Sequence, residues 1–107
     1  MTKVKVCPGP CKLEAFITAE ENDEGGVNVK VETDCKSIND LMASVGEEFD
    51  PFEICFAKPG NGPFVESINE NGFPVHGSCP VLNAIVKAIE AEAGLALEQN
   101  VVIEFID

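Results

Sequence analysis

Five cysteines and a single histidine are the residues of this sequence best suited to chemistry. Cys7 and Cys11 bracket a Pro-Gly-Pro turn, Cys35 follows a strand-like run, and Cys79 comes three residues after His76. Thiolate and imidazole ligands bind zinc, and sets of four thiolates also hold iron–sulfur clusters. We therefore interpret Cys7, Cys11, Cys35 and Cys79 as a candidate site for zinc or an iron–sulfur cluster, with His76 as an additional ligand.

The spacing of these cysteines leaves other interpretations open. Zinc sites usually contain paired C-x2-C turns, whereas this chain has one C-x3-C segment and isolated cysteines. Cys35 and Cys79 are also expected as half-buried residues at helix starts, and His76 as an ordinary loop residue. Cys55, in Phe-Glu-Ile-Cys-Phe, is expected as a small buried hydrophobe.

Cys79 is also a candidate reactive thiol, which is a second class of function. It precedes Pro80 at the start of the longest amphipathic run, where a helix dipole favours the thiolate. Four lysines flank the cysteine segments and favour the same form: Lys3, Lys5, Lys12 and Lys36. Thiol exchange would require Cys35 as the resolving partner, which depends on the two helix starts being neighbours.

Two helices are predicted to position these residues. Apolar residues at helical spacing predict a helix after Pro80, ended by Gly94. A second helix is predicted from Ser37, as N-cap, to Gly46. Alternation predicts strands at 3–6, 13–20 and 27–31, and weaker alternation favours a strand at 52–56. One helical turn is expected at 64–68. The nearly continuous apolar run at 101–106 predicts an interior strand.

This order of elements predicts an α+β fold. Its form is a two-layer sandwich: a mainly antiparallel sheet of about four or five strands with two helices on one face. The 107 residues suffice for a single domain, 1–107. Phe16 alternates with the apolar set of its strand, which suggests that both faces of the sheet are at least partly covered.

The charge balance restricts the partners. Nineteen acidic residues against seven lysines and no arginine give a net charge of −12, which disfavours nucleic acid and anionic membrane surfaces. A basic protein partner suits such a chain, so a third hypothesis is a metal-free acidic interaction module serving a redox enzyme. Its contact surfaces would be the loops 59–63 and 72–76. The start lacks a secretory signal, so we expect a cytoplasmic protein of undetermined oligomeric state.

The segment 77–90, Gly-Ser-Cys-Pro-Val-Leu-Asn-Ala-Ile-Val-Lys-Ala-Ile-Glu, resembles the Ser-Cys-Pro-Asp helix start of the TSCPD domain. The hairpin followed by Asp34-Cys35 is similar to the strand–cysteine–helix segment of that family, and the likeness extends over residues 12 to 95. Gly77 stands where the family has threonine, and Val81 where it has aspartate. The resemblance implies an α+β module that is metal-linked or accessory to a redox enzyme, with no catalytic residue carried over.

Overall fold

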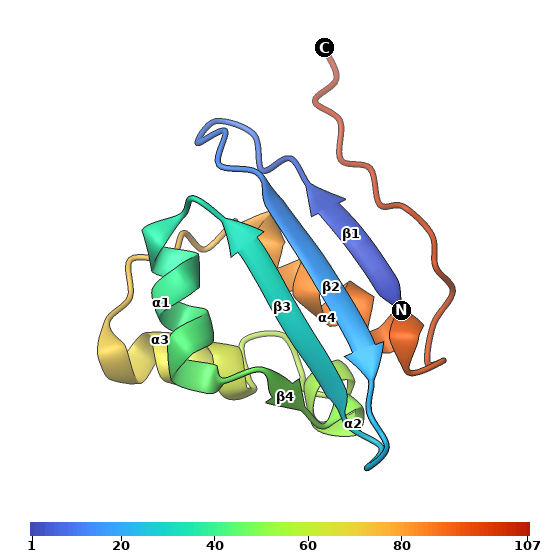
Figure 1. Cartoon of the computed structure of the whole chain (residues 1–107). Helices are drawn as coiled ribbons and strands as arrows, with labels where there is room; N and C mark the ends of the chain where they lie inside the picture. The colour runs from blue at the N-terminus through green and yellow to red at the C-terminus, as the bar shows by residue number, and fades with distance from the viewer.

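A four-stranded antiparallel sheet forms one layer of the protein in the computed structural model, which describes residues 1–107. The strands lie in the order β1-β2-β3-β4. Their bounds are β1 (Thr2–Val6), β2 (Ala15–Glu21), β3 (Val27–Thr33) and β4 (Glu48–Phe49). In register, Val6 pairs with Ala15 and Ala15 with Thr33, so these three residues mark one end of the sheet. We call it the upper end, as it is oriented in Figure 1.

Four helices form the second layer, all on one side of the sheet (Figure 1). Their bounds are α1 (Lys36–Val45), α2 (Pro51–Cys55), α3 (Pro63–Asn71) and α4 (Pro80–Glu92). Helix α4 packs across β1 and β2, whereas α1 lies beside β3 and carries α3 on its other side. The predicted α+β class is therefore confirmed, with four helices where the sequence indicated two.

The core lies between α4 and the inner face of the sheet. Alternate residues of the central strands, such as Ile17 and Val29, are fully buried against Ile85 and Ile89 of α4. Burying each such side chain stabilises the fold by about 1.5–3 kcal/mol. The period of two in the strands and of 3.6 in the helix thus direct both apolar sets to the same interior.

The outer face of the sheet is open to solvent, and this differs from the prediction. Phe16 points outward and is 49% exposed, together with the neighbouring side chains of Lys5 and Glu32 in the same cross-strand row. No helix covers this face, because all four helices pack on the other side. Phe16 therefore lies on an exposed surface, and the second face of the sheet is not covered.

Residues 51–55 form helix α2 and Phe56 is its C-cap, so the predicted strand at 52–56 is wrong. Asp50 accepts a hydrogen bond from the Phe52 amide at 2.9 Å and caps α2, and Pro51 occupies its first turn. An aspartate cap followed by proline favours a helix over a strand, even though apolar and polar residues alternate in the segment that follows. Cys55 is half-buried on this helix.

Two further boundaries differ from the predictions. The N-cap of α1 is Cys35 and not Ser37, and the Thr33 hydroxyl accepts a hydrogen bond from the Cys35 amide. The expected single turn at 64–68 is the nine-residue helix α3, which begins at Pro63. By contrast, the predicted end of α4 is confirmed, because Gly94 adopts a left-handed φ of 75°.

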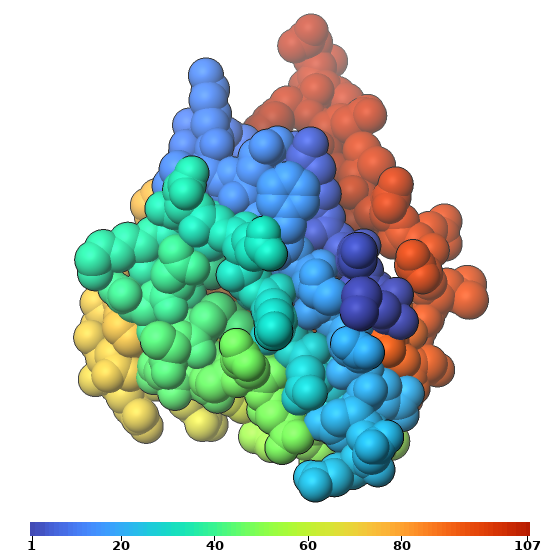
Figure 2. Space-filling view, in the orientation of Figure 1, coloured from blue at the N-terminus to red at the C-terminus, as the bar shows by residue number.

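The C-terminal segment, residues 95–107, forms no strand, so the prediction of an interior strand at 101–106 is wrong. Its large apolar side chains are exposed, and Phe105 has no covered surface at all. Figure 2 shows this segment, in red, projecting beyond the body of the molecule. None of the helices of this chain is both long enough and apolar enough to cross a membrane.

Candidate functional site

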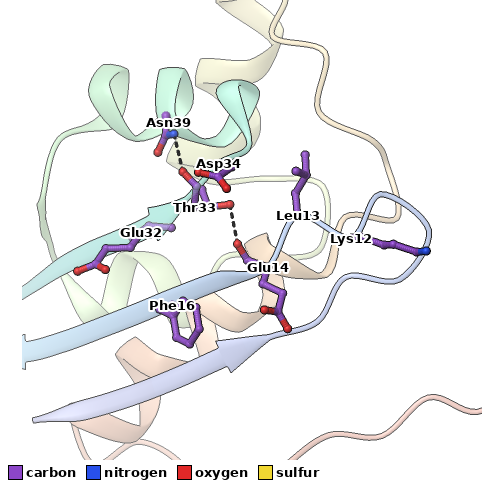
Figure 3. A pocket seen from close by; sticks show the side chains of 9 residues that line it. Lys12, Leu13, Glu14, Phe16, Glu32, Thr33, Asp34 and Asn39 are labelled. Atoms are coloured by element: carbon purple, nitrogen blue, oxygen red, sulfur yellow. Dashed lines mark hydrogen bonds between the residues drawn. The ribbon is translucent and has the colours of Figure 1, made fainter.

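An open depression of about 530 Å³ lies at the upper end of the outer face, where β2 begins and β3 ends (Figure 3). Acidic, aromatic and amide side chains line it. The lining residues are Lys12, Leu13, Glu14, Phe16, Val31, Glu32, Thr33, Asp34 and Asn39. Strands β2 and β3 contribute Phe16, Val31, Glu32 and Thr33, and the connections beside them contribute most of the other lining residues.

Three hydrogen bonds centred on Thr33 hold the rim. The Thr33 hydroxyl donates to the Glu14 carbonyl at 2.8 Å and accepts from the Cys35 amide at 3.2 Å. The Asn39 side chain donates to the Thr33 carbonyl at 2.9 Å (Figure 3). One threonine therefore ties the start of β2 to the end of β3 and to the first turn of α1, which fixes the backbone around the depression.

The ring of Phe16 already contacts one cation of the chain. The Lys5 ammonium lies 5.9 Å from the ring centroid and 3.5 Å from a Glu14 carboxylate oxygen. A cation over an aromatic face is attracted by the negative charge of that face. The same surface thus has the components that bind an ammonium or guanidinium group: an exposed ring and a carboxylate beside it.

Two further carboxylates that line the depression make no internal contact. Glu32 and Asp34 take part in no ion pair and no side-chain hydrogen bond, although both line the depression. Lys12 is the only basic residue of the lining, and its side chain points away from the depression in Figure 3. The local charge is therefore negative and available to a cationic ligand.

The cysteines of the predicted metal site lie toward the same end of the sheet but do not form a compact ligand set. Cys7 and Cys11 are exposed in the β1–β2 connection, and Cys35 and Cys79 are half-buried N-caps of α1 and α4. Both helices begin near the upper end (Figure 1). All five cysteines are free, and no group of three or more His, Cys, Asp or Glu side chains is arranged to hold a metal ion.

Cys7 carries a thiol that is stabilised in its protonated form. Its Sγ donates a hydrogen bond to Glu14 at 3.3 Å. That hydrogen bond, with some burial and the nearby carboxylate charge, raises the pKa of Cys7, although Lys5 acts in the opposite direction. Burial is the larger cause that raises the pKa of Cys55, and the negative charge of Glu90 raises it further. Neither thiol is activated as a thiolate in this arrangement.

The remaining predicted residues have structural surroundings. The Cys79 side chain packs against the core, and its amide donates to the His76 carbonyl at 3.0 Å. The His76 side chain is exposed and makes no hydrogen bond. The depression lined by Phe16, which we call the Phe16 depression, was not predicted from the sequence. The one available signal was a phenylalanine on the polar side of an alternating strand.

The fold and this surface define an α+β protein with helices on one face of an antiparallel sheet and an acidic, aromatic opposite face. A family model described as a family of unknown function, DUF6951, matches residues 2–105. The chain therefore belongs to the DUF6951 family. No curated protein and no solved structure matches it.

The resemblance to the TSCPD domain is wrong, because the matching family is DUF6951. The shared Ser-Cys-Pro segment has a simple local cause in this structure. Cys79 is the N-cap of α4 and Pro80 its first residue. Proline is favoured at that position because its missing N–H is not needed there, so such segments recur at unrelated helix starts.

Proposed function

We propose that this protein is an interaction module that binds a lysine- or arginine-bearing segment of a partner protein in the Phe16 depression. One observation carries the proposal: the exposed ring of Phe16 lines an open depression of about 530 Å³ together with the carboxylates of Glu14, Glu32 and Asp34. A basic side chain would place its cation over the ring and against the carboxylates.

The charge of the whole chain supports the same assignment. A net charge of −12 attracts a basic partner over long range and accelerates its association at low ionic strength. The depression then supplies the local recognition, because the rim is held by the Thr33 hydrogen bonds before any ligand arrives. Pre-formed sites lose less conformational entropy on binding.

The lining favours binding over chemistry. The Thr33 hydroxyl, the only hydroxyl group that lines the depression, is engaged with the Glu14 carbonyl and the Cys35 amide. The carboxylates lie at the surface, where water competes for charge and limits each contact to about 1 kcal/mol or less. We therefore expect weak, salt-sensitive binding of the kind that serves transient protein contacts.

The test uses a short lysine- and arginine-rich peptide with a fluorescent label, titrated with the full chain at low salt. The double variant Glu32→Gln/Asp34→Asn removes two carboxylates that make no internal contact, so the fold is kept. The matched control, Glu66→Gln/Glu70→Gln, removes two exposed charges on α3, away from the depression. Both variants change the net charge equally.

We expect the affinity to fall about fivefold to tenfold in the first variant and less than about twofold in the control, by the usual strength of exposed charge pairs. Equal losses in the two variants would reduce the interaction to overall charge and remove the case for a site. A Phe16→Ala variant should also weaken binding, since the ring contact is lost.

A second proposal retains the cysteines. We propose that Cys7, Cys11, Cys35 and Cys79 bind zinc or an iron–sulfur cluster once the exposed β1–β2 connection moves toward the helix starts. The placement of the β1–β2 connection and of the α1 and α4 N-termini toward the upper end supports it. Anaerobic purification without an affinity metal, followed by elemental analysis, tests it. Metal-free protein with five titratable thiols would reject this second proposal.

A further inference from the structure

The C-terminal segment, residues 95–107, exposes apolar side chains that a folded chain normally buries. Leu97, Ile103, Phe105 and Ile106 are each at least 86% exposed. Beyond the Leu95 amide, which donates to the Glu90 carbonyl, no hydrogen bond joins the segment to the rest of the chain. The part from residue 97 to residue 107 forms no regular secondary structure, and the end of the segment projects beyond the body of the molecule (Figure 2).

The sequence of this segment has the properties of a β-strand. Val101, Ile103 and Phe105 fall on one side of an extended chain, and Val102, Glu104 and Ile106 on the other. β-Branched and aromatic residues favour strands, and one side is entirely apolar. The DUF6951 match runs to residue 105, so the segment belongs to the region that the family shares.

Strand β1 offers a matching edge. It pairs only with β2, so the backbone groups of Thr2–Val6 on its other side have no strand partner. Its inner face carries Val4 and Val6 against α4, and its outer face carries Lys3 and Lys5. An unpaired edge of this kind readily accepts another strand.

The two surfaces complement each other in polarity and charge. A strand that adds to β1 with Ile103 and Phe105 on the inner side continues the apolar layer over α4. The alternation then places Glu104 on the outer side, beside Lys3 or Lys5. The opposite facing would set Glu104 against the apolar layer, so charge selects one facing of the strand.

We propose that residues 101–106 of one copy add to the β1 edge of a second copy, in a reciprocal two-fold exchange. The structure holds the segment clear of its own edge, which leaves both the strand and the edge available to another copy. A two-fold exchange fills both β1 edges at once and closes the assembly. Strand β4, at the other edge, has only two residues and offers little for further growth.

The mass of the full chain in analytical ultracentrifugation tests this inference across a wide range of concentration. We expect twice the monomer mass of 11.4 kDa at high concentration, and a monomer at every concentration for a chain lacking residues 101–107. At concentrations where the full chain is monomeric, the truncated chain should have the same circular dichroism spectrum and melting temperature as the full chain, because the segment contributes nothing to the core of a single copy.

A charge exchange gives the specific control. Glu104→Lys should weaken self-association about threefold to tenfold by placing like charges together, and Lys3→Glu in the same chain should restore it. Lys3 makes no ion pair in the structure, so this second change leaves the fold intact.

Three outcomes would overturn the inference. They are a monomeric full chain, a dimer that survives the truncation, and a monomer in which the amides of 101–106 are protected from hydrogen exchange. The last outcome would show the segment paired with its own β1. The Glu32→Gln/Asp34→Asn variant of the Phe16 depression should dimerise normally, so failure of the proposed peptide binding and failure of this exchange are distinguishable.

Discussion

Glu92 connects three parts of the fold, and replacing it should reveal how much that connection contributes. Its carboxylate accepts hydrogen bonds from the Thr2 hydroxyl at 2.8 Å and the Glu21 amide at 3.0 Å. It also lies 3.3 Å from the N-terminal ammonium of Met1. The last turn of α4 is thereby fastened to the lower ends of β1 and β2.

The expected cost of Glu92→Ala follows from these contacts. Hydrogen bonds to charged groups contribute about 1.5 kcal/mol or more each, and an exposed ion pair contributes about 0.5 kcal/mol or less. The Thr2 side chain is almost fully buried and would keep an unpaired hydroxyl. We expect a loss of about 3 kcal/mol in the free energy of unfolding. At an unfolding entropy of about 2.1 cal/mol/K per residue, this lowers Tm by about 13 °C.

The effect should depend on pH with a defined sign. The Glu21 amide, the Thr2 hydroxyl and the N-terminal ammonium lower the pKa of Glu92 from its ordinary value of 4.5. A carboxyl group whose pKa is lower in the folded state stabilises that state above its unfolded pKa. This stabilisation is lost as the pH falls through the folded pKa. The difference between wild type and Glu92→Ala should therefore be constant near neutrality and shrink below about pH 4.5.

Thermal and urea unfolding from pH 7 to pH 3 measure this difference, with Glu70→Ala as control. Glu70 is exposed and makes no hydrogen bond or ion pair, so its loss should change Tm by about 2 °C or less. An equal effect of the two substitutions, or a Glu92 effect that persists undiminished at pH 3, would refute the reasoning.

Three other substitutions, two of them paired with a control substitution, test the packing and the site. In urea unfolding, Gly94→Ala should lower the free energy of unfolding by about 1 kcal/mol, because Gly94 has a φ of 75°. The control is Gly77→Ala, which adds a methyl group in open space at an ordinary φ and should be nearly neutral. Ile85→Ala, at a fully buried position, should cost about 2–5 kcal/mol in the same assay, and a smaller loss would contradict close packing there. Lys5→Ala should strengthen basic-peptide binding about twofold to threefold, since Lys5 competes for Phe16 and Glu14, and Lys58→Ala, with the same charge change, should have the smaller effect in the titration.

The sequence by itself determined the elements whose local signals agree with their surroundings. Val27, Val29 and Val31 alternate with polar residues and form β3. Cys79, Pro80 and Gly94 mark the ends of α4, because proline suits a first turn and glycine a left-handed end. The α+β class followed, since these periodic apolar faces must bury each other.

Other features were decided by tertiary structure, because one local pattern is compatible with two environments. The alternation in 52–56 also fits a short helix, once Asp50 caps it and α4 supplies a surface to pack on. Phe16 faces solvent because the helices all pack on the opposite side, which the strand pattern alone does not specify.

The cysteines and the C-terminal segment show the same division. Composition identified Cys7, Cys11, Cys35 and Cys79, but the distances between them depend on how the β1–β2 connection and two helix starts lie together. The apolar run at 101–106 indicates that these residues are suited to burial. These side chains are exposed in the folded chain, and the sheet edge that could accept them exists only in three dimensions.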